Sequence, residues 1–272
     1  AALCKDREVI VSRGQLIEIG GSFRLPDCIT QSGAIMVEVG TTNKTHLADY
    51  ERALSDNTGA ILRVNPSNYR IVGFSKQVSI AELASLKSKK SVLVIDDLGC
   101  GALVDLRQYG LPEEPTVRES IEAGADIALF SGDKLIGGPQ AGIIVGKKEL
   151  IARIKKHPLT RMLRVCKLTD MAMEHTLRLF LDPGTLAERH PTIRMLTIPS
   201  ETLRVRAESL KRRLVDSGCP FDIAVEEDES AVGGGSLPLA SIQTWVLAVR
   251  SPELDADALS RLLRLREPPV IA

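Results

Sequence analysis

The sequence predicts an α/β protein: a large domain built on a mostly parallel sheet, followed by a smaller α+β domain. Three observations predict this fold class. Strand signals alternate with helical stretches through the first half of the chain. These strands are continuously apolar, which is typical of strands covered by helices on both faces. The length of 272 residues, with 44% hydrophobic residues, allows one large core and a second, smaller one.

Six short apolar runs are expected to form the sheet of the large domain. They are Val9–Ser12, Ile35–Val39, Ala60–Val64, Val92–Asp96, Ile127–Phe130 and Gly142–Val145. In a parallel sheet the carboxyl ends of the strands share one edge, and ligands bind along that edge. Polar residues that directly follow these runs are therefore the first candidates for a site.

Helical periodicity is found between the strands. The expected helices cover Thr45–Leu54, Ser79–Lys89 and Thr116–Ala123. The second and third open with a hydroxyl residue that has a glutamate three residues later: Ser79 with Glu82, and Thr116 with Glu119. Such a capping box satisfies two backbone N–H groups at a helix start. We therefore expect helices to begin at these two positions.

Beyond Gly146 the chain becomes basic and helical, and then ends in a small mixed domain. Helices are expected over Leu168–Leu181, Glu201–Ser217 and Asp255–Leu265, and strands over Phe221–Val225 and Thr244–Val249. The apolar spacing predicts which residues of the first two helices face inward: Met171, Leu177 and Phe180 in the first, and Leu203, Val205, Leu210 and Leu214 in the second.

This change in composition and in predicted secondary structure suggests that the chain has three parts. We expect a large domain over 1–158, a helical interdomain linker over 159–198 and a small α+β domain over 199–272. A strand signal at Val9–Ser12 has no starting signal before it, and an apolar run begins at Val270 near the other end. We therefore expect both domains to be incomplete and the chain to be a fragment of a longer protein.

Composition excludes several classes of protein. No apolar stretch approaches the ~20 residues that span a bilayer. Aromatic residues make up 3% of the chain and the net charge is +0, which disfavours a nucleic-acid-binding surface. Five scattered cysteines and four histidines show no metal-ligand spacing. Unpaired cysteines are typical of reduced thiols, so we expect a cytoplasmic protein without a metal site.

Lys134 is the main candidate for chemistry. It lies in a glycine-rich turn that follows the buried strand Ile127–Phe130. An amine at the end of a buried strand is costly to keep charged, and a neutral amine forms Schiff bases with carbonyl compounds. Pyridoxal phosphate is the usual carbonyl held in this way. The alternative is a solvated lysine in a β-turn, and the turn alone does not exclude it.

Polar residues follow two other strands at the same predicted edge. Asp97 closes the strand Val92–Asp96, where a carboxylate can keep the ring nitrogen of a pyridoxal protonated. Asp96 is its neighbour, and because side chains alternate along a strand, only one of the two acids faces the ring. Asn68, after Ala60–Val64, is a candidate for the phenolic oxygen, and Ser131 for the phosphate. Turn or capping roles remain the alternatives for these side chains.

Arg161 and Arg164 lie three residues apart in the basic stretch. On a helix they would share one face and could hold an anion between two guanidinium groups. The alternative is a solvated basic face.

Several long stretches closely resemble one known family. Residues 131–146 read Ser-Gly-Asp-Lys-Leu-Ile-Gly-Gly-Pro-Gln-Ala-Gly-Ile-Ile-Val-Gly, and residues 38–46 read Glu-Val-Gly-Thr-Thr-Asn-Lys-Thr-His. Stretches 11–26, 97–112 and 233–238 match as well, in the same order. These residues resemble bacterial selenocysteine synthase, the L-seryl-tRNA(Sec) selenium transferase family.

The resemblance implies a fold-type-I, aspartate-aminotransferase-like enzyme that uses pyridoxal 5'-phosphate. Lys134 would carry the Schiff base, Asp97 would face the pyridinium nitrogen, and Asp133 would assist. Arg161 and Arg164 match arginines that bind the selenium donor. The implied reaction converts seryl-tRNA(Sec) to selenocysteinyl-tRNA(Sec) through an aminoacrylyl intermediate, with selenophosphate as the donor. The family also implies a homo-oligomer built from dimers, with a decamer expected.

The chain departs from the family pattern at three places. Asn65-Pro66 stands where relatives usually have His-Thr, Cys100 where they have serine, and Cys166 where they have an acid. The resemblance also implies that the family's N-terminal tRNA-contacting region lies outside this sequence. A related pyridoxal-phosphate lyase acting on a small amino acid, and an inactive remnant, are therefore kept as alternatives.

Overall fold

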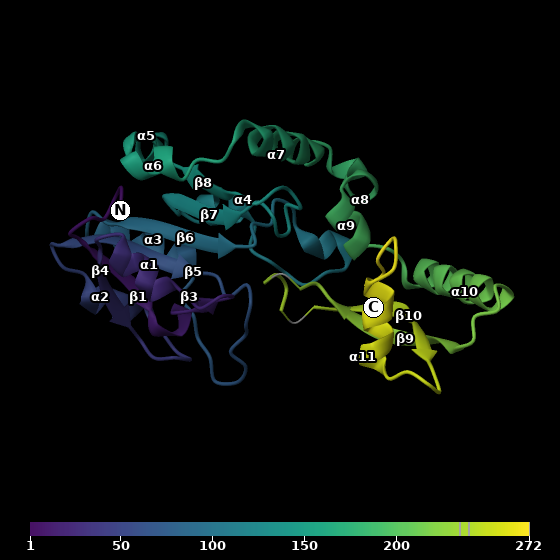
Figure 1. Ribbon diagram of the computed structural model, residues 1–272. Coiled ribbons are helices and arrows are strands. Elements are labelled where there is room, and N and C mark those ends of the chain that lie inside the picture. Colours follow the sequence, from purple (N-terminus) through teal and green to yellow (C-terminus); the bar gives the residue numbers. More distant parts are fainter. Residues whose placement is uncertain (234, 239, 272) are drawn as a thin grey trace. The chain divides into compact units, whose positions relative to one another are not determined.

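The protein is described by a computed structural model that covers residues 1–233, 235–238 and 240–271 (Figure 1). The chain forms two compact units. The first comprises Ala1–Met195 and Val232–Ala240, and the second Leu196–Ala231 and Ser241–Ala272. The expected division into a large domain, a helical linker and a small domain at 158 and 198 stays a prediction.

A six-stranded sheet forms the centre of the first unit. Its strand order is β4-β1-β5-β6-β7-β8. The strands are β1 (Glu8–Ser12), β4 (Ile35–Val39), β5 (Thr58–Val64), β6 (Leu93–Gly99), β7 (Ile127–Ser131) and β8 (Gly142–Gly146). All neighbours pair in parallel except β7 and β8, which are antiparallel. The mostly parallel sheet expected from the sequence is confirmed, and β8 runs backwards because the short connection after β7 contains no crossover helix.

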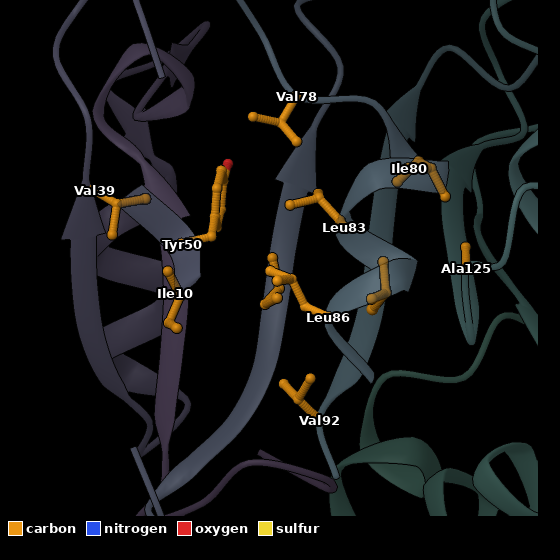
Figure 2. Packing of buried hydrophobic residues seen from close by; sticks show 11 residues of the cluster. Ile10, Val39, Tyr50, Val78, Ile80, Leu83, Leu86, Val92 and Ala125 are labelled. Carbon is orange, nitrogen blue, oxygen red and sulfur yellow. The ribbon is translucent and has the colours of Figure 1, made fainter. Parts of the chain in front are cut away.

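Both faces of the sheet are covered, which explains the continuously apolar strands. On one face Ile10 and Ile61 pack with Tyr50 of α2 (Leu47–Ala53) and Leu83 of α3 (Ile80–Ser85), as Figure 2 shows for the labelled side chains. On the other face the alternate strand residues pack against Ile29 of α1 (Leu25–Gln31). Successive strand residues thus enter two different cores.

The two predicted capping boxes are confirmed. Ser79 accepts a hydrogen bond from the backbone of Glu82 at the start of α3, and Thr116 does the same for Glu119 at α4 (Val117–Glu122). The remaining short elements of this unit are β2 (Glu18–Ile19), β3 (Phe23–Arg24), and the 3-10 turns η1 (Arg13–Gln15), η2 (Leu86–Ser88), η3 (Leu106–Tyr109) and η4 (Pro183–Thr185).

A run of helices follows β8. They are α5 (Lys148–Lys156), α6 (Pro158–Met162), α7 (Lys167–Leu179), α8 (Leu186–Arg189) and α9 (Pro191–Leu196). The expectation that Met171 faces inward is wrong, since its side chain is 66% exposed. Leu177 and Phe180, which were also predicted to face inward, do pack with Leu98 and Ile136, and Met173 joins them in place of Met171. A surface helix buries a single stripe, and this stripe runs through positions 173, 177 and 180.

The second unit contains α10 (Ser200–Asp216), the antiparallel pair β9 (Asp222–Ala231) and β10 (Ser241–Arg250), and α11 (Ala256–Arg264). Val205 and Leu210 were expected to be buried but are 57% and 43% exposed. Ala207 is the buried residue of α10. A two-stranded sheet offers this helix one narrow face, so the apolar positions on its flanks stay in solvent.

Candidate active site

A cavity of about 280 Å³ lies at the carboxyl ends of β5 and β6. Its polar wall comes from the turn after β5, from the end of β6, and from Lys134; Ile17 and Ile19 add apolar surface. The lining residues are Ile17, Ile19, Gly20, Val64, Asn65, Ser67, Asn68, Asp97, Gly99, Lys134 and Gly235. The cavity therefore occupies the edge where the parallel sheet predicts a ligand.

Lys134 lies half-buried in the turn between β7 and β8. The turn is tied together by hydrogen bonds from the backbone N–H of Gly137 to the carbonyl of Lys134 (2.9 Å) and from Gly138 to Gly132 (2.8 Å). Two glycines with positive φ flank the amine: a Cβ added to Gly235 would lie 3.5 Å from Nζ, and one added to Gly99 4.0 Å. The absence of these two side chains leaves space beside the amine for a bound group.

Asp97 shares the cavity with Lys134. It lies near the end of β6, opposite Val64 of β5, and its carboxylate accepts a hydrogen bond from the backbone of Gly99 at 3.0 Å. Burial raises the pKa of the Asp97 carboxyl above its ordinary value, although the Gly99 hydrogen bond and the charge of Lys134 oppose this rise. A cationic partner placed in the cavity would therefore stabilise its ionised form.

Asp96 faces away from the cavity. Its fully buried carboxylate accepts hydrogen bonds from Arg63 Nη1 at 2.8 Å and from Ser120 Oγ at 2.6 Å. The alternation of side chains along β6 separates the two neighbouring acids, so Asp96 belongs to a buried ion pair and Asp97 to the cavity.

The other candidates are divided between the cavity and the surface. Asn68 lines the cavity and is exposed. Ser131 is the last residue of β7, and Asp133 is an exposed neighbour of Lys134; neither lines the cavity.

Arg161 and Arg164 also lie outside the cavity lining, and the expectation that they share one helix face is wrong. Arg161 belongs to α6, which ends at Met162, so Arg164 lies in the connection to α7. The helix α6 buries none of its residues, and without a packed face there is little to extend it by another turn.

Sequence reasoning missed several lining residues. Asn65 and Ser67 were available as signals, because they directly follow a strand at the correct edge. Gly235 lies in a glycine run remote in the sequence. Glu114 does not line the cavity and gave no local signal, but its buried carboxylate accepts hydrogen bonds from the lining residue Asn65 (Nδ2, 2.6 Å) and from Cys100 Sγ (2.9 Å).

The cavity residues fit pyridoxal phosphate. They combine an amine with free space beside it and a buried carboxylate that gains from a cationic ring nitrogen. Among the described residues, no group of three or more histidine, cysteine, aspartate or glutamate side chains is placed to hold a metal ion. No helix in the described part of the chain has the length and apolar character needed to cross a bilayer.

Comparison with known proteins points to one family. A family model described as "SelA: L-seryl-tRNA selenium transferase" matches residues 1–272. The L-seryl-tRNA(Sec) selenium transferase of Alkaliphilus oremlandii is 48% identical over the whole chain, which covers 58% of that protein. The enzyme of Alkaliphilus metalliredigens is 51% identical over 268 residues, which are 98% of this chain and 57% of that one. The chain thus spans somewhat more than half the length of these curated relatives.

A solved structure shows the same fold. The model matches a D-glucosaminate-6-phosphate ammonia-lyase with a TM-score of 0.64 and 22% sequence identity, over 98% of this chain and 61% of the other. The expected fold class, that of the fold-type-I pyridoxal-phosphate enzymes, is confirmed.

Proposed function

Because this chain belongs to the L-seryl-tRNA selenium transferase family, we propose that its cavity holds pyridoxal 5'-phosphate on Lys134 and converts L-seryl-tRNA(Sec) to L-selenocysteinyl-tRNA(Sec). Selenophosphate is the proposed selenium donor. The observation that carries the proposal is the placement of Lys134 and Asp97 on the wall of one cavity, at the ligand-binding edge of this fold. When bound, pyridoxal phosphate supplies an electron sink for a carbanion beside the substrate amine.

The residues of the chain then take distinct roles. Asp97 would hold the proton on the ring nitrogen, because a cationic nitrogen there would stabilise the buried Asp97 carboxylate. Asn68 and Ser131 are proposed to hold the phenolic oxygen and the phosphate. The Lys134 amine carries a proton to and from the substrate at its Nζ atom, and Asp133 assists beside it.

Arg161 and Arg164 are proposed to bind the anionic selenium donor. Both guanidinium groups are exposed, and neither has an ion-pair partner within residues 1–233, 235–238 and 240–271. Two fixed cations can hold a small anion in one orientation through paired hydrogen bonds.

Further proposals concern the setting of the reaction. All five cysteines are free thiols, and we propose the cytoplasm as the compartment. The partners would be seryl-tRNA(Sec) and further copies of the same chain.

The test is selenium incorporation into seryl-tRNA(Sec) from selenophosphate by the natural full-length protein. Borohydride should fix pyridoxal phosphate onto Lys134, and Lys134→Ala should abolish both labelling and transfer. Arg161→Ala or Arg164→Ala should leave labelling intact and weaken donor use about tenfold or more, the effect of one lost charge-assisted hydrogen bond.

The alternatives predict other outcomes of the same experiment. Elimination from free serine without transfer to tRNA would favour a lyase acting on a small amino acid. Absence of labelling on Lys134 would favour an inactive remnant. Unchanged donor dependence in both arginine variants would reduce these residues to a basic surface.

A further inference from the structure

A buried polar cluster lies behind the wall of the Lys134 cavity. It consists of Asn65, Cys100 and Glu114, whose exposed fractions are 7%, 1% and 4%. Asn65 Nδ2 and Cys100 Sγ donate to the same carboxylate oxygen, Oε1 of Glu114, at 2.6 and 2.9 Å. No lysine or arginine of the described chain forms an ion pair with Glu114. A buried carboxylate held only by neutral donors is costly, so its retention calls for a reason.

Asn65 connects this cluster to the cavity. It is the first residue after β5 and one of the lining residues, and its backbone N–H donates to the carbonyl of Asp97 at 2.7 Å. Its amide can be oriented in only one way, because the nitrogen must face the Glu114 carboxylate while the oxygen accepts from Arg63 Nη2 at 3.4 Å.

Glu114 uses one of the two amide hydrogens of Asn65. Within the described residues, Glu114 is the acceptor found for the Asn65 amide nitrogen, which leaves the second hydrogen for a bound group. An amide that donates to a carboxylate is held firmly, since hydrogen bonds to a charged acceptor are stronger than neutral ones. The pair therefore fixes the amide of Asn65, a residue that lines the same cavity as Asp97 and Lys134.

We infer that Glu114 is a positioning residue that fixes the side-chain amide of Asn65 at the cavity wall, where Asn65 donates to an oxygen acceptor of the bound group. This inference rests on the proposed function, because it takes pyridoxal phosphate as the occupant. Among the described residues, the hydrogen bonds to Glu114 Oε1 come from Asn65 and Cys100, and of these two only Asn65 lines the cavity, so the proposed effect of Glu114 passes through Asn65.

The test measures binding of pyridoxal phosphate to the natural full-length protein, through the visible absorbance band that the cofactor gains on bonding to a lysine. Glu114→Gln keeps the shape of the side chain and removes its charge. Glu114→Asp keeps the charge but withdraws the oxygen by one methylene. Both variants should bind pyridoxal phosphate about tenfold more weakly, as expected for one lost charge-assisted hydrogen bond, and should shift the band. The matched control is Glu113→Gln, which changes an exposed neighbour and should do neither.

A double-variant comparison separates positioning from general support of the fold. Asn65→Ala should weaken binding to a similar degree, and adding Glu114→Gln to it should cause less than about a twofold further change. Equal effects of Glu114→Gln in both backgrounds, or none in either, would overturn the inference. If Glu114→Gln fails to fold, the same comparison is made with Glu114→Asp, alone and combined with Asn65→Ala. If the wild-type protein shows no absorbance band, the proposed function itself is overturned. If the wild type shows the band and the substitutions at residue 114 change neither the band nor the affinity, only the inference is overturned.

Discussion

Asp96 and Asp97 are adjacent on β6, but their side chains face opposite sides of the sheet and therefore have different roles. Asp96 has no exposed surface and is neutralised by Arg63, whereas Asp97 lines the cavity without a dedicated cation. The raised pKa of Asp97 means that burial of its ionised form is incompletely compensated. The ionised Asp97 carboxylate is therefore unfavourable when no ligand is bound, and a bound cationic ligand would stabilise it.

Asp97→Asn should stabilise the protein without cofactor at neutral pH. The folded protein binds the Asp97 proton more tightly than the unfolded chain, so wild-type stability is lost as pH rises from the ordinary carboxyl pKa through the raised one. Asparagine does not titrate and avoids this loss. We expect a higher Tm for the variant, at about 2–4 °C per kcal/mol gained, measured by calorimetry.

The pH dependence provides the control for this prediction. The difference in Tm should be largest above the raised pKa and should vanish in acid below the ordinary carboxyl pKa. A variant that is less stable than wild type at neutral pH would show that the carboxylate is well compensated. Binding of pyridoxal phosphate should weaken in the same variant, because an amide cannot keep the ring nitrogen protonated.

Asn65 and Cys100, two positions where the sequence is expected to depart from the family pattern, meet on one atom. Both donate to Oε1 of Glu114. Burial and the Glu114 charge raise the pKa of the Cys100 thiol, so this cysteine stays protonated and can act as a donor. The departures therefore form one hydrogen-bonded cluster.

The turn that carries Lys134 is held in place by His190. This fully buried imidazole lies before α9, with Nε2 2.7 Å from the carbonyl of Ile136 and Nδ1 3.2 Å from the backbone nitrogen of Ile193. A carbonyl only accepts and a backbone N–H only donates, so Nε2 carries the hydrogen and Nδ1 the lone pair. A Cβ on Gly137 would lie 2.8 Å from the ring, so glycine permits this close contact.

Two variants of His190 should separate its two hydrogen bonds. Glutamine can keep the donor to Ile136, and asparagine can keep the acceptor for Ile193. In hydrogen-exchange measurements, His190→Asn should speed exchange of the Gly137 and Gly138 amides about tenfold relative to His190→Gln, as expected for loss of about 1.4 kcal/mol. Equal acceleration at this turn in both variants would mean that the ring acts only by filling space.

At the scale of the whole molecule, the connection between β5 and α3 presents apolar surface to solvent. Val72 and Phe74 are 84% and 86% exposed. Adjacent exposed apolar side chains are typical of protein interfaces. This surface supports the proposal that the natural full-length protein is a homo-oligomer. The family resemblance implies that it is built from dimers, with a decamer as the expected form, and light scattering measures its mass.

A substitution in this connection should change the assembly. Phe74→Asp should lower the measured mass, because it places a charge where apolar surface is expected to be covered. Gln77→Asp adds the same charge to an exposed polar position of the connection and should leave the mass unchanged. A monomeric wild-type protein at micromolar concentration would contradict the prediction, and equal effects of the two variants would exclude Phe74 from an interface.

The sequence by itself determined the strands, the capped helices and the placement of Lys134 and Asp97 at one edge of the sheet. Each of these depends on local information. Continuous apolar runs mark doubly covered strands, Ser79 and Thr116 carry their own capping glutamates, and the carboxyl ends of parallel strands must share an edge. The chemistry of a lysine and an acid at that edge then follows.

The tertiary structure alone decided which residues complete the cavity. Gly235 reaches it from a distant segment, and Glu114 supports the lining residue Asn65 from behind the wall; both placements depend on how the chain packs. Packing also corrected Met171, Val205 and Leu210, because a helix buries only the stripe that meets a neighbour. Arg161 and Arg164 illustrate the same limit. Their three-residue spacing can be seen in the sequence, but one helix includes both only if it has a packed face, and α6 buries none of its residues.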